Sequence, residues 1–230
     1  MSGPAQSTIR SAPLSPGLAA EETTAMYDLY TWSTPNGLKP LFLLEELGIP
    51  YRLHPVDLRQ GQSRTPEFAR INPNGKIPAL IVDAGTPEEA RVFESGAILI
   101  YVAEREKRFL APHGAARAQA LSWLMFQMSA VGPMMGQLAS FLRASEPAPP
   151  AVVERFRTEV ERILTVLEAR LGEAEYLAGE YGIADMATFP WLAGLAYVEM
   201  SLDGRPQLSR WFQAIASRPA VERARGKKMA

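Results

Sequence analysis

The sequence predicts an α/β domain followed by an all-α domain. Over residues 26–107, strand-like and helix-like runs alternate in the order βαβαββα. Beyond them the strand signals stop, and over residues 117–230 the apolar residues recur with helical spacing. Residues 108–116 contain proline and glycine between the two patterns, and are expected to form the linker between the domains.

The α/β domain is expected to open with a β-rich run at residues 26–32. A helix follows at residues 38–47, where apolar residues have helical spacing, and Gly48 is expected to end it. The remaining elements expected here are strands at 51–56, 79–82 and 90–93 and helices at 66–71 and 95–105.

The all-α domain is expected to begin with a long helix at residues 117–143. Gly132-Pro133 predicts a kink in it, because proline removes a hydrogen bond to the preceding turn. Asp185 matches an N-terminal helix box, with Gly182 at the cap position. The other helices are expected at 152–171, ended by Gly172, at 183–199, at 206–217 and after Pro219.

Composition excludes several classes of function. The 230 residues include no cysteine, which removes disulfides, thiolate metal sites and a cysteine nucleophile, so any sulfur chemistry must use sulfur from the substrate. His54 and His113 are far apart, and neither has carboxylates at ligand spacing, which argues against a metal site. A net charge of -1 argues against nucleic acid, and no apolar run is long enough to span a bilayer.

Residues 1–25 are rich in Ser, Pro and Ala. A flexible tail is expected there, because such a composition buries little apolar surface. The alternative is a segment that folds over a partner subunit. No signal-peptide apolar region is visible, so a cytoplasmic protein is expected.

The stretch Asn74-Gly75-Lys76-Ile77-Pro78-Ala79-Leu80 predicts a peptide-binding turn. Proline cannot donate to a sheet, so Pro78 is expected at the mouth of the strand, and a cis Ile77-Pro78 bond is expected there. Such a bond would turn the backbone N–H and C=O of Ile77 away from the sheet. An extended peptide could then pair with them.

The stretch Phe93-Glu94-Ser95-Gly96-Ala97-Ile98 places an acid and a hydroxyl where a strand gives way to a helix. A free helix N-terminus carries unpaired N–H groups that favour a carboxylate. Glu94 can hold an ammonium while Ser95 and the helix hold the neighbouring carboxylate. The two stretches together predict a clamp for a short peptide with a free α-amino-acid end.

These two stretches resemble the thioredoxin-like domain of cytosolic glutathione transferases. Ser33-Thr34-Pro35-Asn36-Gly37 and Gly132-Pro133-Met134-Met135-Gly136-Gln137 resemble the Nu class of that family, and the resemblance extends from residue 26 to about residue 220. It implies a thioredoxin-like first domain, an all-α second domain and a homodimer. It also implies that Ile77 pairs with the cysteinyl backbone of glutathione, and that Glu94 and Ser95 hold its γ-glutamyl end.

Thr34 lies where the first strand leads into the first helix, so its hydroxyl is either a helix N-cap or a donor to the glutathione thiolate. Asn36 and the helix start would add positive potential. A charge-assisted hydrogen bond of about 1.5–3 kcal/mol and a helix terminus of about 0.3–1 kcal/mol would lower a thiol pKa by roughly one to three units. Tyr30 matches the tyrosine that other transferase classes use, and is expected to be structural here.

Several polar residues keep two interpretations. Asn72 and Asn74 are expected to be scaffolding of the clamp turn. Lys76 reaches a substrate carboxylate or is only solvated. Arg155 matches a position from which Nu-class proteins offer an arginine to glutathione in the other subunit, and the alternative is a solvated helix arginine. Gln62 lies one place before the position where the family often has a second-site glutamine, so its contact with substrate stays open.

The methionines of the long helix also keep two interpretations, because methionine packs adaptably. They line a pocket for the second substrate, or they pack in the core or at a subunit interface. The residues concerned are Met125, Met128, Met134 and Met135.

The resemblance implies a glutathione-dependent disulfide reductase, in which the bound thiolate attacks and a second glutathione completes the exchange. Peroxide reduction and thiol addition to an electrophile would use the same thiolate. Glutathione is then the co-substrate, with a small disulfide, peroxide or electrophile as partner, and no metal is expected. The alternative of a different class is a regulatory module that binds glutathione without turnover.

Overall fold

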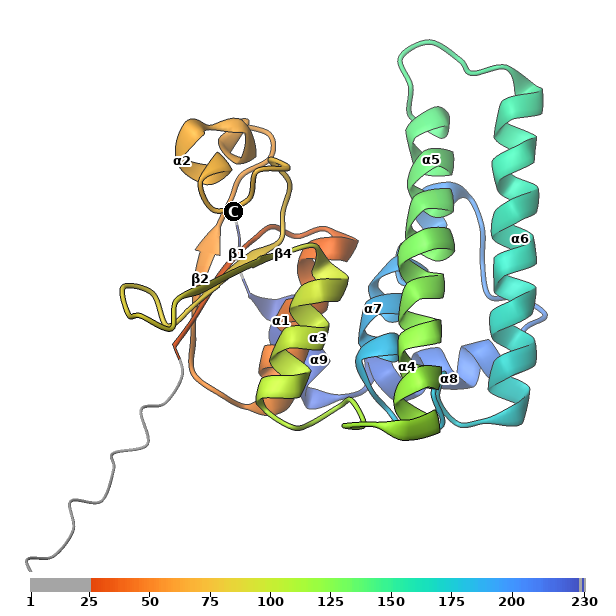
Figure 1. Cartoon of the computed structure of the whole chain (residues 1–230). Helices are drawn as coiled ribbons and strands as arrows, with labels where there is room; N and C mark the ends of the chain where they lie inside the picture. The colour runs from red at the N-terminus through yellow and green to blue at the C-terminus, as the bar shows by residue number, and fades with distance from the viewer. Residues whose placement is uncertain (1–25, 228, 230) are drawn as a thin grey trace, which may run out of the picture.

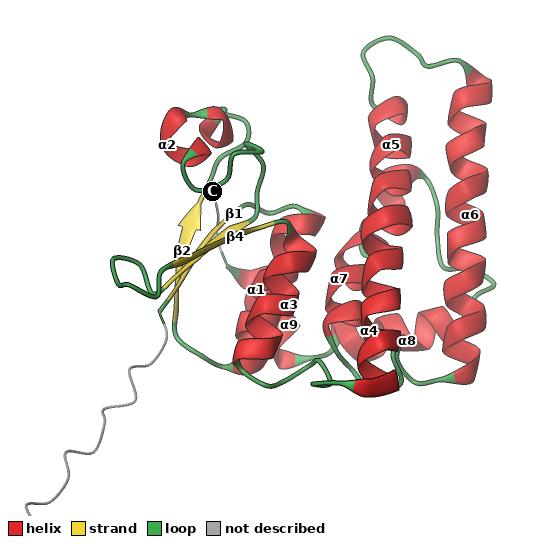
Figure 2. Cartoon of the chain, viewed as in Figure 1, coloured by secondary structure: helices red, strands yellow, loops and turns green. Residues whose placement is uncertain are grey.

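The computed structural model describes residues 26–227 and 229, so the tail predicted at residues 1–25 lies outside the described residues. It has a sheet with flanking helices followed by a wholly helical part, as the sequence predicted (Figures 1 and 2). The strands are β1 (Tyr27–Thr31), β2 (Tyr51–Pro55), β3 (Ala79–Val82) and β4 (Ala90–Phe93). The helices of this part are α1 (Pro35–Leu47), η1 (Gln62–Arg64), α2 (Pro66–Ala69) and α3 (Ser95–Arg105).

The helical part contains α4 (Gly114–Phe126), η2 (Gln127–Val131), α5 (Gly132–Leu142), α6 (Pro150–Glu173), α7 (Ile183–Leu192), η3 (Leu195–Val198), α8 (Pro206–Ala216) and α9 (Pro219–Gly226). In Figure 1, α4 and α5 run as one column beside α6. No described helix combines the length and the apolar character needed to cross a membrane.

The four strands form one mixed sheet in the order β2-β1-β3-β4. β1 is parallel to β2 and antiparallel to β3, which is in turn antiparallel to β4. Every residue of β3 is buried, as expected for a central strand. The side chains of Tyr27 and Leu29 point into the main core, which continues through α1 and α3 into the helical part.

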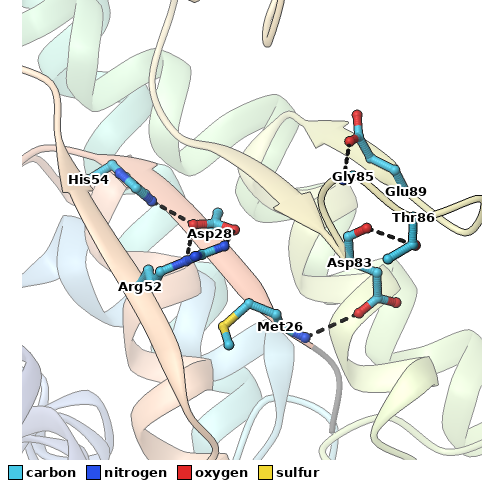
Figure 3. A network of polar contacts seen from close by, with 8 residues as sticks. All are labelled: Met26, Asp28, Arg52, His54, Asp83, Gly85, Thr86 and Glu89. Atoms are coloured by element: carbon cyan, nitrogen blue, oxygen red, sulfur yellow. Dashed lines mark hydrogen bonds and ion pairs between the residues drawn. The ribbon is translucent and has the colours of Figure 1, made fainter. Parts of the chain in front are cut away.

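The opposite face of the sheet carries a polar network (Figure 3). Asp28 is buried there and accepts two hydrogen bonds from Arg52, at 2.7 and 2.6 Å, while His54 Nε2 lies 2.6 Å from the same carboxylate. Burial alone raises the pKa of Asp28, but the bonds from Arg52 and His54 hold it below its usual value. Tyr30 stacks on His54 with 4.4 Å between ring centroids. Tyr30 therefore packs on this face.

Several element boundaries differ from the sequence prediction. α1 begins at Pro35 rather than at residue 38, because Thr34 caps the helix and proline fits its first position. α6 continues past Gly172 to Glu173. The helix predicted at 183–199 ends at Leu192, and a short 3₁₀ turn follows Gly194.

The interruption predicted at Gly132-Pro133 lies one turn earlier. α4 starts at Gly114 rather than 117, and η2 is a π-helical turn that ends just before Gly132. Proline cannot donate to the turn before it, so the irregular backbone is found in the preceding residues. This turn brings Gln127 into the interior, where it is fully buried.

The helix box at the start of α7 is built from Asp185. Its carboxylate accepts hydrogen bonds from the N–H groups of Gly182, at 3.0 Å, and Leu177, at 3.0 Å, and from Trp211 Nε1 at 2.7 Å. A Cβ at position 182 would lie 2.7 Å from the carbonyl oxygen of Phe109. That close approach explains why glycine occupies the cap position.

The contact between α9 and α1 joins the two parts of the chain. α9 packs against α1, where Glu45 forms ion pairs with Arg223 at 2.8 Å and Lys227 at 3.1 Å. Next to it, Glu46 pairs with Arg218 at 2.5 Å and accepts a hydrogen bond from Tyr181 at 3.1 Å. The two parts of the chain are therefore joined by charged contacts as well as by a shared apolar core.

Candidate functional site

The candidate site begins at the turn from β1 into α1. Thr34 Oγ1 accepts the N–H of Gly37 at 3.1 Å and so caps α1. A hydroxyl that accepts this bond still has its own hydrogen to donate. The two interpretations of Thr34 are therefore compatible, since the cap uses the oxygen and leaves the hydrogen for a ligand. Thr34 lines a cavity of about 540 Å³ together with Pro35, Asn36 and Trp191.

Asn36 is oriented by a residue from the helical part. Trp191 Nε1 on α7 donates to Asn36 Oδ1 at 3.1 Å. Because the oxygen of the amide is occupied in this way, the NH₂ group is the part of the side chain left for a ligand. Trp191 was not predicted from the sequence.

The clamp turn has the predicted backbone, with a cis Ile77-Pro78 peptide bond. Asn72 is buried and holds the turn, because its Nδ2 donates to the carbonyl of Lys76 at 2.5 Å and its Oδ1 accepts the N–H of Asn74 at 2.9 Å. The scaffolding role predicted for Asn72 is confirmed.

Glu94 and Ser95 lie at the start of α3, beside the clamp turn. Glu94 has a φ of 67°, in the region that favours glycine, which costs roughly 1–3 kcal/mol and is typical of functional sites. Its exposed carboxylate accepts a hydrogen bond from Asn74 Nδ2 at 3.2 Å. Asn74 therefore also contacts a predicted binding residue. Ser95 is buried as the first residue of the helix.

A second hollow, of about 150 Å³, lies against these residues. It is lined by Asn36, Asn72, Asn74, Lys76, Ile77, Pro78, Glu94 and Ser95. Together with the cavity at Thr34, which also reaches Lys76 and Ile77, it brings together every predicted site residue except Arg155. One face of the molecule thus offers a hydroxyl, an amide, a free helix start and a carboxylate.

A buried lysine lies directly behind this face. Lys39 on α1 is only 1% exposed, and its Nζ donates to Gln127 Oε1 at 2.6 Å and to Ser95 Oγ at 3.5 Å. Burial lowers the pKa of Lys39 to about 7, although the nearby Glu94 carboxylate opposes the shift. Neither Lys39 nor Gln127 was predicted from the sequence. Their contacts are long-range, and no local pattern indicates them.

A third cavity, of about 530 Å³, opens on the other side of Thr34, between α1, α5 and α7. It shares Thr34, Pro35 and Trp191 with the first cavity and has a largely apolar wall. Arg143 and Arg225 are the charged residues in its lining. A second reactant could therefore approach Thr34 from this side.

The methionines of the α4–α5 column divide between the two predicted roles. Met135 lines the third cavity. Met128 lies behind Ser95, with its sulfur 3.9 Å from Ser95 Oγ. Met134 packs partly buried on the core, and Met125 is exposed. The pocket interpretation therefore fits Met135 alone among them.

Two residues with open interpretations lie away from these cavities. Gln62 Oε1 accepts the N–H of Asp57 at 2.8 Å, so the side chain folds back on its own loop. Instead, Ser63 and Arg64 line the cavity at Thr34. Arg155 is an exposed residue of α6 and belongs to none of the three cavities.

Within residues 26–227 and 229, no three His, Asp or Glu side chains gather in a way that could hold a metal ion. What the site offers is hydrogen-bond donors and a helix start, which stabilise anions.

Family models match both parts of the chain. The model described as "Glutathione S-transferase, N-terminal domain" matches residues 25–104, and the one described as "Glutathione S-transferase, C-terminal domain" matches residues 131–219. Among curated relatives, the disulfide-bond oxidoreductase YfcG of Escherichia coli (strain K12) is 42% identical over 86% of this chain and 94% of its own. The disulfide-bond oxidoreductase YghU of the same organism is 36% identical over 86% of this chain and 73% of its own.

Solved structures are similar over nearly the same span. A glutathione transferase family member from Pseudomonas fluorescens pf-5, solved with two glutathione bound, superposes with a TM-score of 0.82 and 40% identity, over 89% of this chain and 94% of that one. A glutathione transferase from Pseudomonas putida, solved with one glutathione disulfide per subunit, gives a TM-score of 0.81 and 36% identity, over 89% of this chain and 92% of that one.

Proposed function

This chain belongs to the glutathione S-transferase family, and we propose that it uses bound glutathione to reduce disulfide bonds. The observation that carries the proposal is the position of Thr34. Its hydroxyl lies on the cavity that also reaches the Ile77 clamp, and an apolar cavity opens on its other side. The relatives named disulfide-bond oxidoreductases, and the neighbours solved with glutathione or its disulfide, support the same reaction.

Glutathione would lie in extended form across the clamp turn. Its cysteinyl backbone would pair with the N–H and C=O of Ile77, next to the buried Pro78. The γ-glutamyl ammonium would bind the carboxylate of Glu94, and its carboxylate would bind Ser95 and the N–H groups at the start of α3. Lys76, exposed at the edge of both cavities, is placed to meet the remaining carboxylate.

The sulfur of glutathione would lie at Thr34. The Thr34 hydroxyl would donate to it, and the NH₂ group of Asn36 and the start of α1 would add positive potential. These groups stabilise the thiolate over the thiol, so no protein base is required. Because the chain has no cysteine, the bound glutathione supplies the nucleophile.

The reaction would proceed by two exchanges. The bound thiolate attacks one sulfur of the substrate disulfide, a new S–S bond forms, and the other sulfur leaves as a thiolate that takes up a proton. A second glutathione thiolate then attacks the glutathionyl sulfur of the mixed disulfide. This releases the second substrate thiol and leaves glutathione disulfide. The two electrons come from the two glutathione molecules.

The apolar cavity beyond Thr34 is where the second reactant would bind. Its apolar wall and its two arginines, Arg143 and Arg225, favour an apolar disulfide that carries a negative charge. A peroxide or an electrophile could react with the same thiolate, so peroxide reduction and conjugation are the alternative activities. A regulatory module that only binds glutathione is the alternative of a different class.

We also propose a homodimer that acts in the cytoplasm. Phe93 and Met125 are large apolar side chains that are 39% and 47% exposed in the single chain, which favours a further partner surface. Arg155 is exposed on α6, and we propose that it reaches glutathione in the partner subunit.

The test is a turnover assay with glutathione and a small disulfide, run beside calorimetric titration of glutathione. Disulfide reduction that is slower at neutral pH in Thr34→Ala, with a pH profile moved upward, supports the proposal. Parallel assays with a peroxide and an electrophile identify the dominant reaction. Tight binding without turnover of any of the three substrates would instead identify a binding module. The absence of glutathione binding would overturn the proposal as a whole.

A further inference from the structure

The cluster formed by Lys39, Gln127 and Ser95 links the interior of the protein to the glutathione site. Lys39 comes from α1, Gln127 from the π-helical turn η2, and Ser95 from the first position of α3. Removing a lysine ammonium from water costs several kcal/mol, so a buried lysine is rarely kept for stability. An apolar side chain of similar length would fill the same space without that cost.

Gln127 serves to hold the ammonium of Lys39. Its Oε1 accepts the short bond from Lys39 at 2.6 Å, while its Nε2 is buried and has no hydrogen-bond partner among the described residues. A buried amide that leaves its donor unpaired is itself costly. The buried position of Gln127 is therefore explained by the hydrogen bond that it accepts from Lys39. The π-helical turn places it there.

Ser95 lies between Lys39 and the ligand side of the site. Its Oγ can accept from Lys39 Nζ at 3.5 Å, and its hydrogen currently points to Met128 Sδ at 3.9 Å. Thioether sulfur is a weak acceptor, so the hydroxyl can turn to a ligand carboxylate at little cost. Lys39, Ser95 and the carboxylate would then form one chain of hydrogen bonds.

We propose that Lys39 is a buried positioning residue for the α-carboxylate of glutathione, and that it takes up a proton when this carboxylate binds at Ser95. The inference rests on the proposed function, since it requires glutathione at the start of α3. The ammonium of Lys39 adds a positive charge that acts through Ser95 without contacting the ligand.

Among the described charged groups on the elements packed against α1, Glu94 is the one that acts on the pKa of Lys39, and others are paired elsewhere. Glu94 is the neighbour whose carboxylate favours the protonated lysine. From α7, Asp185 is bound by Trp211 and backbone N–H groups. From α9, Arg223 is paired with Glu45. η2 contributes the uncharged Gln127 and Met128. A ligand carboxylate is therefore the additional negative charge that can shift the titration of Lys39.

The size of the effect follows from the distances. Lys39 is only partly protonated near neutral pH, since burial lowers its pKa to about 7. A carboxylate hydrogen-bonded to Ser95 would lie about 6 Å from Nζ and raise that pKa by roughly one to two units. Binding at pH 7.5 should then take up about half to three-quarters of a proton. Affinity should be about five- to tenfold weaker at pH 8 than at pH 6.

The experiment is calorimetric titration with S-methylglutathione, whose blocked thiol does not titrate. Two buffers with different ionisation enthalpies report the protons taken up on binding. The wild-type protein should show the uptake and the pH dependence above. Lys39→Met should bind at least tenfold more weakly at pH 6, with no uptake and a flat profile. Lys107→Met removes an exposed lysine just beyond the far end of α3, and should match the wild type.

The outcomes separate this inference from the proposed function. Binding that depends on Glu94 but takes up no proton would overturn the role of Lys39 and leave the glutathione site intact. Uptake that persists in Lys39→Met would also overturn it, because another group would then be titrating. No binding at any pH would overturn both. If Lys39→Met does not fold, Lys39→Gln replaces it in the assay, and the absence of proton uptake in the wild-type protein overturns the role of Lys39 without any variant.

Discussion

The indole Nε1 of Trp191 on α7 donates a hydrogen bond to the side-chain oxygen of Asn36 on α1, at 3.1 Å. A residue of the helical part thus orients a polar group that faces the cavity at Thr34. The same indole lies between the two cavities that meet at Thr34. The helical part therefore contributes directly to the geometry of the cavity at Thr34.

Trp191→Phe should lower turnover without preventing glutathione binding. The substitution removes one neutral hydrogen bond of about 0.5–1.5 kcal/mol, so kcat/KM for a small disulfide should fall about two- to tenfold. Steady-state kinetics measures the change. Trp123→Phe, on α4 and outside the three cavities, is the matched control. Equal rates for both variants would show that Asn36 needs no such support.

Thr34→Ala should move the pH profile of turnover upward and change glutathione affinity little. Loss of a charge-assisted bond of about 1.5–3 kcal/mol raises the pKa of the bound thiol by roughly one to two units. Loss of the cap on α1 should also cost about 0.5–2 kcal/mol of stability. Thr34→Ser should restore both properties. An unchanged rate and profile in Thr34→Ala would make Asn36, which lines the same cavity, the leading candidate.

Glu94→Gln should weaken glutathione binding strongly while leaving the fold intact. The amide keeps the shape of the side chain but loses the charge that would hold the γ-glutamyl ammonium. A loss of about 1.5–3 kcal/mol corresponds to a dissociation constant about ten- to 150-fold higher. Isothermal titration checks it, with the exposed Glu88→Gln as control. Unchanged affinity would remove Glu94 from the site.

Lys39→Met should stabilise the unliganded protein, and this stabilisation should become smaller as the pH rises. The folded pKa of Lys39 is about 7, below the unfolded value of about 10.4, so the unfolded chain binds more protons between these values. Wild-type stability therefore increases with pH in that window. The advantage of Lys39→Met should shrink by about 1–3 kcal/mol from pH 7 to pH 9. Urea unfolding of both proteins at several pH values measures this difference. Free energies of unfolding that change with pH in the same way for both proteins would contradict the prediction.

Arg155→Ala should weaken glutathione binding only if the protein is a dimer. A partly exposed charge pair of about 0.5–1.5 kcal/mol predicts a two- to tenfold loss. Arg162→Ala, which removes another arginine of α6 that pairs with Glu159 at 2.7 Å, is the control. Sedimentation gives the oligomeric state in the same buffer. A dimer with unchanged affinity would leave Arg155 as a solvated residue.

The sequence predicted those parts of the site that depend on local chemistry. Thr34 caps the helix that Pro35 begins, the Ile77-Pro78 bond is cis, and Glu94 precedes a helix start. Each of these is decided by residues a few positions apart. The βαβαββα order of elements in the first part and the helical character of the second part followed from periodicity for the same reason.

The residues that were missed depend on distant parts of the chain. Lys39 has the appearance of a surface lysine in an amphipathic helix, and its acceptor Gln127 lies 88 residues further on. Trp191 lies 155 residues from Asn36. The end of α6 was also missed, because Gly172 lies inside a helix that continues to Glu173. Burial and long-range contacts decide such cases, and neither is visible in a local window.

The position of α9 has a consequence for synthesis on the ribosome. α9 lies beside α1 (Figure 1). α1 carries Thr34 and Asn36 near its start, and near its far end Glu45 pairs with Arg223 and Lys227. Domains generally begin to fold while the chain is still emerging. The glutathione-binding part can therefore start to fold early, but α1 acquires its full set of ion pairs only after residues 219–227 have left the exit tunnel. A segment translated long after α1 thus completes the helix that begins beside Thr34.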